Sequence, residues 1–138
     1  GNADRQDLDA SIGSLTTEGS VAFNERYPEG VPHQYCGEGP KVASNGVHYY
    51  SWSGVQPATN AADISDPLLL GTSLAFGDEQ NDGLVSRCSS HLGKTIRDDY
   101  RMNHLDEINQ VIGLHHLTET DPTVIYRQQA NRLRHAGL

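Results

Sequence analysis

A serine, an aspartate and a histidine occur in the order that one class of serine hydrolases uses for its catalytic triad. Residues 71–75, Gly-Thr-Ser-Leu-Ala, fit the G-x-S-x-G/A pattern of a nucleophilic serine, and Asp82 and His104 follow. In that class, further strands and helices lie between the serine turn and the aspartate. Only nine positions separate Ser73 from Asp82, too few for that excursion. We therefore interpret Ser73 as an ordinary helix or loop residue.

Asp82 and His104 remain candidates for acid–base chemistry because of their local context. Asp82 falls within residues 80–85 and His104 within residues 101–107, each in a loop beside a predicted extended stretch. Loops held by a sheet are where catalytic acids and bases normally lie. An aspartate before a glycine is also an ordinary turn residue, and His104 is one of 7 histidines. Residue types alone leave a catalytic and a structural role open.

Four acidic residues, Asp63, Asp66, Asp106 and Glu107, are candidates for metal binding. Calcium takes several hard oxygen ligands, but the chain lacks the D-x-D-x-D-G loop of an EF-hand, so a calcium site would have to be discontinuous. The alternative that these residue types favour is a set of solvated carboxylates and helix caps.

The composition describes an acidic protein with ordinary globular proportions. The formal net charge is −8, which argues against nucleic acid or an anionic membrane surface as the main partner.

The two cysteines, Cys36 and Cys88, lack zinc-site or C-x-x-C spacing, so a long-range disulfide and two buried thiols both fit. The 138 residues begin at Gly1 without a signal peptide, so we expect a processed or shortened product.

The elements that must position these residues are short and separated by long loops. Helix signals are apolar spacing and two Asp-Pro starts, and strand signals are β-rich residues after the Asn-Gly turn at residues 45–46. The predicted helices are 7–15, 17–26, one starting at Asp66 and one from Asp121 to Gly137. The predicted strands are 47–52, 84–85 and 94–97, and residues 27–41 form an irregular connection.

Several longer strings together carry a family resemblance. They are Tyr-Tyr-Ser-Trp-Ser-Gly at 49–54, Asn-Asp-Gly-Leu-Val at 81–85, Cys-Ser-Ser-His-Leu-Gly at 88–93, Asn-His-Leu-Asp-Glu-Ile-Asn-Gln at 103–110 and Tyr-Arg-Gln-Gln-Ala-Asn-Arg-Leu at 126–133. The chain closely resembles the C-terminal half of the secreted, foldase-dependent triacylglycerol lipases of the Pseudomonas and Burkholderia type. Residues 15–19 and 23–28 also resemble the stretch that follows the lid in that family.

The resemblance implies roles for the chemistry-bearing residues. Asp82 and His104 match the aspartate and histidine of the family's Ser-His-Asp triad, and Cys36 and Cys88 match its one disulfide.

The resemblance also implies a structural calcium ion. Asp63 and Asp106 match its carboxylate ligands, and Gln110 and Leu114 match the positions that supply backbone carbonyls.

For the fold, the resemblance implies the α/β class. The chain is expected to be the C-terminal part of an α/β-hydrolase fold, with its last strands and helices and without the nucleophile-elbow half. Residues 1–138 would form a portion of one lipase domain with no internal boundary. No residue matches the nucleophilic serine, the oxyanion-hole loop or the lid helix, so the isolated chain is expected to be inactive.

For function, the resemblance implies part of a lipid-degrading enzyme, a triacylglycerol lipase that hydrolyses carboxylic esters. Expected partners are the upstream N-terminal half of the same lipase, a triacylglycerol or other ester at a lipid–water interface, and a lipase-specific foldase. Nucleic acid is not expected. The expected location is extracellular, after secretion through the periplasm. The alternative is a stable, non-catalytic calcium-binding fragment or module.

Overall fold

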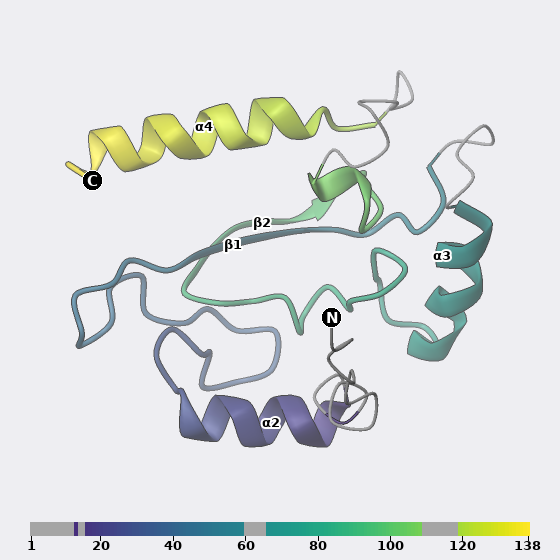
Figure 1. Cartoon of the computed structure of the whole chain (residues 1–138), viewed down its shortest axis with the longest axis horizontal. Helices are drawn as coiled ribbons and strands as arrows, with labels where there is room; N and C mark the ends of the chain where they lie inside the picture. The colour runs from purple at the N-terminus through teal and green to yellow at the C-terminus, as the bar shows by residue number, and fades with distance from the viewer. Residues whose placement is uncertain (1–12, 14–15, 60–65, 109–118) are drawn as a thin grey trace, which may run out of the picture.

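Two parallel strands run through the middle of the chain's computed structural model (Figure 1). The structure describes residues 13, 16–59, 66–108 and 119–138. β1 (Tyr50–Gly54) pairs in parallel with β2 (Lys94–Tyr100). Parallel neighbours need a long crossover connection, and here it contains α3 (Asp66–Ser73) and the 3-10 helix η1 (Leu74–Phe76). Helices around a small parallel sheet agree with the predicted α/β class.

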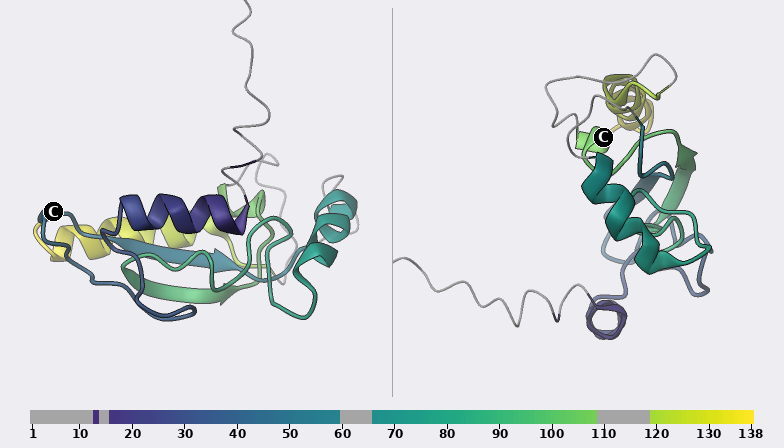
Figure 2. Two further views of the ribbon diagram at one scale, coloured as in Figure 1. Left: turned by 90° about the horizontal axis from the view of Figure 1, so that it is seen from below. Right: turned by 90° about the vertical axis from the view of Figure 1, so that its right-hand side faces the viewer.

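Two further helices in the described part of the chain lie on opposite sides of this sheet. α2 (Thr17–Arg26) lies below it in Figure 1 and α4 (Pro122–His135) above it, and the second view of Figure 2 shows the same separation. A short 3-10 helix, η2 (Asp106–Ile108), lies next to α4, where the Tyr126 hydroxyl donates to the Glu107 carbonyl (3.1 Å). No helix among the described residues is long and apolar enough to cross a membrane.

The buried apolar core is small and joins α4 to the sheet. Tyr100, Met102 and Ile125 form it, with Trp52 packed against them. The rings of Trp52 and Tyr126 pack in a T-shaped arrangement, with the centroids 5.7 Å apart. Since Ile125 and Tyr126 both come from α4, this core fixes that helix on the sheet.

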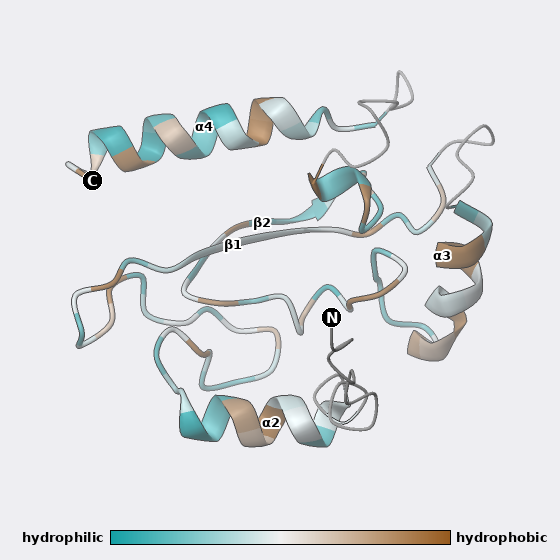
Figure 3. Cartoon of the chain, viewed as in Figure 1, coloured by the Kyte–Doolittle hydropathy of each residue, from teal (hydrophilic) through white to brown (hydrophobic). Residues whose placement is uncertain are grey.

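Much of the remaining apolar surface is exposed. α2 buries none of its residues, and the ribbon of α3 carries several of the brown bands that mark apolar residues (Figure 3). Leu68, Leu70 and Leu74 are all exposed there, Leu74 to 79%. Several exposed leucines on one short helical segment can mark a site of interaction.

The helix predictions agree with the structure wherever it is described. Thr16 caps α2 by accepting from the Gly19 N–H, and Asp121 caps α4 by accepting from the Thr123 N–H. Each of the two Asp-Pro dipeptides begins a helix, as expected from the fixed φ of proline in a first turn. The predicted helix 7–15 lies outside the described residues except for Gly13.

Two strand predictions need correction. The strand predicted at 47–52 begins later, at Tyr50, because Val42 and His48 pair antiparallel around the Asn-Gly turn and form a separate small hairpin. Residues 84–85 form no strand, because their backbone N–H groups both bond to the Asp82 side chain. The strand predicted at 94–97 is confirmed and continues to Tyr100.

The expected disulfide between Cys36 and Cys88 is present and joins two loops. The Cα atoms lie 4.5 Å apart, and 52 positions separate the two residues. Cys36 has φ 64°, an uncommon value for a residue other than glycine. The bond ties the irregular connection before the sheet to the loop that leads into β2.

Replacing both cysteines by serine is expected to lower the free energy of unfolding of the protein by up to about 4 kcal/mol, because the unfolded chain regains the entropy of an open loop of this length. Urea unfolding measures the change. Wild-type protein treated with reductant serves as the control and should unfold at the midpoint of the variant. Equal midpoints for oxidised wild type and the variant would contradict the expectation.

Candidate active site

Asp82 lies in a tight turn that satisfies its buried carboxylate with backbone donors. The residue is 2% exposed, and its Oδ1 accepts from the N–H groups of Leu84 (2.9 Å) and Val85 (2.7 Å). Gly83 sits at φ 105°, and a Cβ there would lie 2.7 Å from the Cβ of Leu69. The turn therefore requires glycine at 83, and it presents the second oxygen of Asp82 to another partner.

That partner is His104. Its Nδ1 lies 2.8 Å from Asp82 Oδ2, and its backbone N–H donates to the Asp82 carbonyl (2.9 Å). Because a carboxylate oxygen can only accept, Nδ1 carries the proton in this contact. The side chain of His104 is 36% exposed and that of Asp82 only 3%. The imidazole therefore has one nitrogen fixed by a buried carboxylate while part of the ring is open to solvent.

The charges around the ring favour its protonated form. The hydrogen bond to the Asp82 carboxylate raises the pKa of His104 above its ordinary value, against the opposing effect of burial. The negative charges of Asp82 and Glu107 act in the same direction as the hydrogen bond. An imidazole held in this way can accept a proton from a nearby group and stabilise the charge that results.

Glu107 is the second carboxyl group beside His104. Burial is the main cause that raises its pKa to about 7, although a hydrogen bond donated by the Gly54 N–H opposes this. A carboxyl group with that pKa is partly protonated at neutral pH. Asp82, which also makes the direct bond to Nδ1, is therefore the better charge partner for the imidazole.

The ligand atoms of Asp82, His104 and Glu107 all lie within 4.8 Å of one another, so this group could hold a metal ion. Its imidazole nitrogen suits zinc and similar transition metals, whereas calcium takes oxygen ligands. The cluster is therefore not the place where the chain would bind calcium.

A second group of buried carboxylates, Asp66 and Asp106, has the oxygen donors that calcium prefers. Thr59 links the two, because its N–H donates to Asp66 Oδ2 (2.6 Å) and its hydroxyl donates to Asp106 Oδ2 (3.1 Å). Both carboxylates are almost fully buried. Of the predicted calcium ligands only Asp106 can be placed, because Asp63, Gln110 and Leu114 lie outside the described residues.

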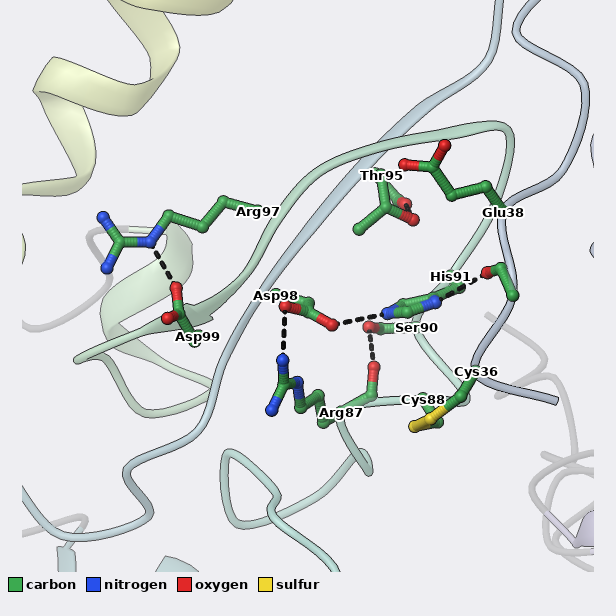
Figure 4. A network of polar contacts seen from close by, with 12 residues as sticks. Cys36, Glu38, Arg87, Cys88, Ser90, His91, Thr95, Arg97, Asp98 and Asp99 are labelled. Carbon is green, nitrogen blue, oxygen red and sulfur yellow. Dashed lines mark hydrogen bonds and ion pairs between the residues drawn. A yellow bond between two sulfur atoms is a disulfide. The ribbon is translucent and has the colours of Figure 1, made fainter.

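The ends of the Asp82 loop are held by a polar network near the disulfide (Figure 4). Arg87 donates from its backbone to the Gln80 carbonyl (2.8 Å) and from its guanidinium to Asp98 Oδ1 (2.9 Å). His91 lies between Asp98 (2.9 Å) and the carbonyl of Gly37 (2.8 Å). The Arg87 guanidinium is the main cause that lowers the pKa of Asp98. The network closes the loop at its base and links it to β2.

Ser73 plays no part in this site. It lies at the end of α3, buried, and its hydroxyl donates to the Leu70 carbonyl (2.7 Å). A nucleophilic serine of the G-x-S-x-G class sits on a sharp turn after a strand, with its hydroxyl exposed. The interpretation of Ser73 as an ordinary helix residue is confirmed.

Asn103 is not among the site residues that the sequence predicts, and Asp66 is predicted only as a helix start and as one of four acidic candidates for metal binding. In the structure Asp66 accepts from Asn103 in the interior. A signal was available for Asn103, because an asparagine two or three residues before unpaired N–H groups often bonds to them.

Comparison of the sequence with known proteins finds several bacterial relatives of this chain. No protein-family model matches the chain. A triacylglycerol lipase of Vibrio cholerae serotype O1 is 60% identical over 138 residues, which is all of this chain and 44% of the relative. The chain is similar over its whole length to part of a bacterial triacylglycerol lipase.

Two further relatives carry the same name. A triacylglycerol lipase of Pseudomonas fragi is 41% identical over 91% of the chain and 45% of its own length, and one of Burkholderia plantarii is 34% identical over 96% of the chain and 45% of its own length. The chain thus spans a little under half the length of these relatives. The lipase resemblance seen in the sequence motifs is confirmed.

Proposed function

We propose that this chain is the C-terminal part of an α/β-hydrolase domain in a triacylglycerol lipase, and that it supplies the acid and the base of a Ser-His-Asp triad. The observation that carries the proposal is the 2.8 Å contact between Asp82 Oδ2 and His104 Nδ1. The relatives' name supplies the substrate class, a triacylglycerol. Residues 1–138 would then form one portion of a single domain.

In this mechanism His104 is the general base. Asp82 holds Nδ1, so the other ring nitrogen of His104 takes the proton from a serine hydroxyl as the serine attacks the ester carbonyl. His104 then returns that proton to the departing glycerol oxygen. The buried Asp82 carboxylate keeps the ring in one orientation and stabilises the imidazolium that forms in between.

The serine and the oxyanion-hole donors would come from the upstream half of the same lipase. None of the motif strings of this chain resembles those parts, and the serine that fits the sequence pattern, Ser73, lies in a helix with its hydroxyl bonded. Without the serine there is no hydroxyl for His104 to deprotonate, and without oxyanion donors the tetrahedral intermediate is not stabilised. The exposed apolar surface of α3 and η1, with Leu68, Leu70 and Leu74, is a suitable surface for that half to cover.

A calcium ion fits the oxygen-rich site beside this triad. Asp106 would be a ligand, with Asp63 and the carbonyls of Gln110 and Leu114 completing the set by family resemblance. Asp106 is buried, and its carboxylate lies beside the Thr59 hydroxyl, so hard oxygen atoms of the kind that calcium prefers are present there. When bound, the ion would act as a structural cross-link. Asp106 lies two residues after His104, so fixing it would hold the base in register.

Secretion agrees with the disulfide, since such bonds persist in oxidising compartments. We propose an extracellular enzyme that passes through the periplasm, folds with a lipase-specific foldase and acts on esters at a lipid–water interface.

A second candidate function is a non-catalytic calcium-binding module. The observation that favours it is the burial of the Asp66 and Asp106 carboxylates. These two groups could bind an ion whether or not the chain takes part in catalysis. Failure of this chain to restore ester hydrolysis with an upstream fragment, together with tight calcium binding, would favour the module.

In the full-length enzyme, His104→Ala is expected to lower kcat for a triacylglycerol by at least about a thousandfold, because the triad base is lost. The assay is release of fatty acid from an emulsion. His135→Ala is the matched control, since His135 is exposed in the last turn of α4, and it should retain wild-type activity. Wild-type turnover in His104→Ala would rule out the proposed mechanism.

Saturating calcium is expected to raise the melting temperature of the enzyme above its value with chelator, because the ion binds the native state only; at a hundred times Kd the gain is about 2.7 kcal/mol. Asp106→Asn should reduce or abolish the difference between calcium and chelator, measured within the variant. Asp78→Asn, in an exposed loop, should keep the wild-type difference. Identical melting curves with calcium and chelator in the wild type would refute the site.

A further inference from the structure

Asn103, the residue before His104, is completely buried, and its backbone and side chain bond to five different residues. Its Oδ1 accepts from the N–H groups of Leu105 (2.8 Å) and Asp106 (2.8 Å), and its own N–H donates to Asp106 Oδ2 (3.2 Å). These bonds fold the chain tightly around His104. The side chain of Asn103 therefore fixes the local shape of the turn that carries the base.

The side-chain NH2 group of Asn103 points away from this turn and contacts α3. Its Nδ2 donates to Asp66 Oδ1 (2.9 Å), across 37 positions of sequence, at the first residue of that helix. The other Asp66 oxygen accepts from the Thr59 N–H (2.6 Å). Asp66 is thus an acceptor at both oxygens, and one of them is fixed on the His104 turn.

α3 also holds the loop that carries Asp82. Near the end of the helix, the Thr72 hydroxyl donates to the Gly83 carbonyl (2.5 Å). Leu69, fully buried, lies directly against Gly83, where no Cβ could fit. One helix of eight residues therefore contacts the His104 turn at its first residue, Asp66, and the Asp82 turn at Leu69 and Thr72, three and six residues later.

We propose that α3 is the frame that sets Asp82 and His104 at their working distance, and that Asn103 is a positioning residue whose bond to Asp66 holds His104 on that frame. The inference rests on the proposed function and extends it to residues outside the triad. A displacement of about one ångström at a catalytic group can cost about a hundredfold in rate, so loosening this contact should affect turnover more than binding.

The chemistry of the contact requires an amide on one side and a carboxylate on the other. The Nδ2 atom of Asn103 donates to Asp66, and its Oδ1 accepts from two backbone N–H groups. An aspartate at 103 could accept these N–H groups but could not donate to Asp66. Asn103→Asp would place two carboxylates against each other in the interior. Asp66→Asn would place amide against amide, and either orientation of the new side chain would set a donor against the N–H of Asn103 or of Thr59.

The double variant Asn103→Asp/Asp66→Asn exchanges the two groups and keeps the hydrogen bond between them. It gives up only the longer contacts of the Thr59 hydroxyl with Asn103 Nδ2 (3.4 Å) and Asp66 Oδ1 (3.5 Å). The new amide at 66 can accept from Thr59 with its oxygen and donate to residue 103 with its nitrogen. The new carboxylate at 103 can still accept from Leu105 and Asp106. Net charge is unchanged, so recovery in the double variant isolates the hydrogen bond from the total charge of the site.

The test measures kcat and KM for an ester in the full-length enzyme with saturating calcium, normalised to active sites counted with a phosphonate. Each single variant is expected to lose tenfold to a hundredfold in kcat with KM within about threefold, and the exchange to recover at least tenfold over the weaker single variant. Asn45→Asp, the same change in an exposed turn where Oδ1 accepts from Val47, is the matched control and should have wild-type kcat.

A spectroscopic readout follows the Asp82–His104 hydrogen bond itself, independently of turnover. The His104 Nδ1 proton, held by Asp82, should give a low-field NMR resonance that is lost or broadened in each single variant and restored in the exchange. Wild-type kcat and resonance in Asn103→Asp, or a double variant no better than the single ones, would overturn the inference. If the wild-type enzyme cleaves no ester, the proposed function fails, and the resonance alone still decides the role of Asn103.

Discussion

A carboxylate as deeply buried as that of Asp82 is costly unless hydrogen-bond donors surround it. The backbone N–H groups of Leu84 and Val85 satisfy one of its oxygens, and the imidazole of His104 satisfies the other. The first pair of bonds forces the chain into a tight turn at Gly83. The third bond draws in a residue 22 positions away. Satisfying one buried charge thus brings the two acid–base residues together.

The surroundings of this pair are polar and buried, whereas the apolar core of the described residues is small. Asp66, Asn103 and Asp106 are all buried and bonded to one another or to Thr59. A fully satisfied network of this kind defines one geometry, whereas apolar packing tolerates several. Here the network lies beside Asp82 and His104, whose separation the proposed mechanism requires to be fixed. The apolar cluster at Ile125 lies between α4 and the sheet and fixes that helix.

Sequence reasoning succeeded where the physical cause is local. An Asp-Pro pair starts a helix through capping and a fixed φ, so the beginnings of α3 and α4 could be predicted. It placed the start of the strand predicted at 47–52 too early and predicted a strand at 84–85 that does not form, because pairing with β2 and the bonds to the Asp82 side chain depend on distant or side-chain contacts. β propensity contains neither kind of information.

The pairing of Asp82 with His104 could not be derived from spacing either. Family resemblance suggested the two residues, while residue types alone left a turn aspartate and an ordinary histidine as alternatives. The role of α3 was beyond both approaches, since Asn103 and Asp66 are far apart in sequence and each has an ordinary local explanation as a turn residue or a helix cap. Only their hydrogen bond in the folded chain reveals the connection.

The pH titration of the His104 imidazole by NMR, in the intact protein and in its Asp82→Asn variant, tests this account most directly. Asparagine keeps an oxygen for the N–H groups of Leu84 and Val85, so the turn can persist while the negative charge is removed. The account predicts a lower pKa for His104 in the variant, because the carboxylate that favours the imidazolium is gone. The same pKa in both proteins would show that Asp82 does not act on His104, and the acid–base pair would have to be abandoned.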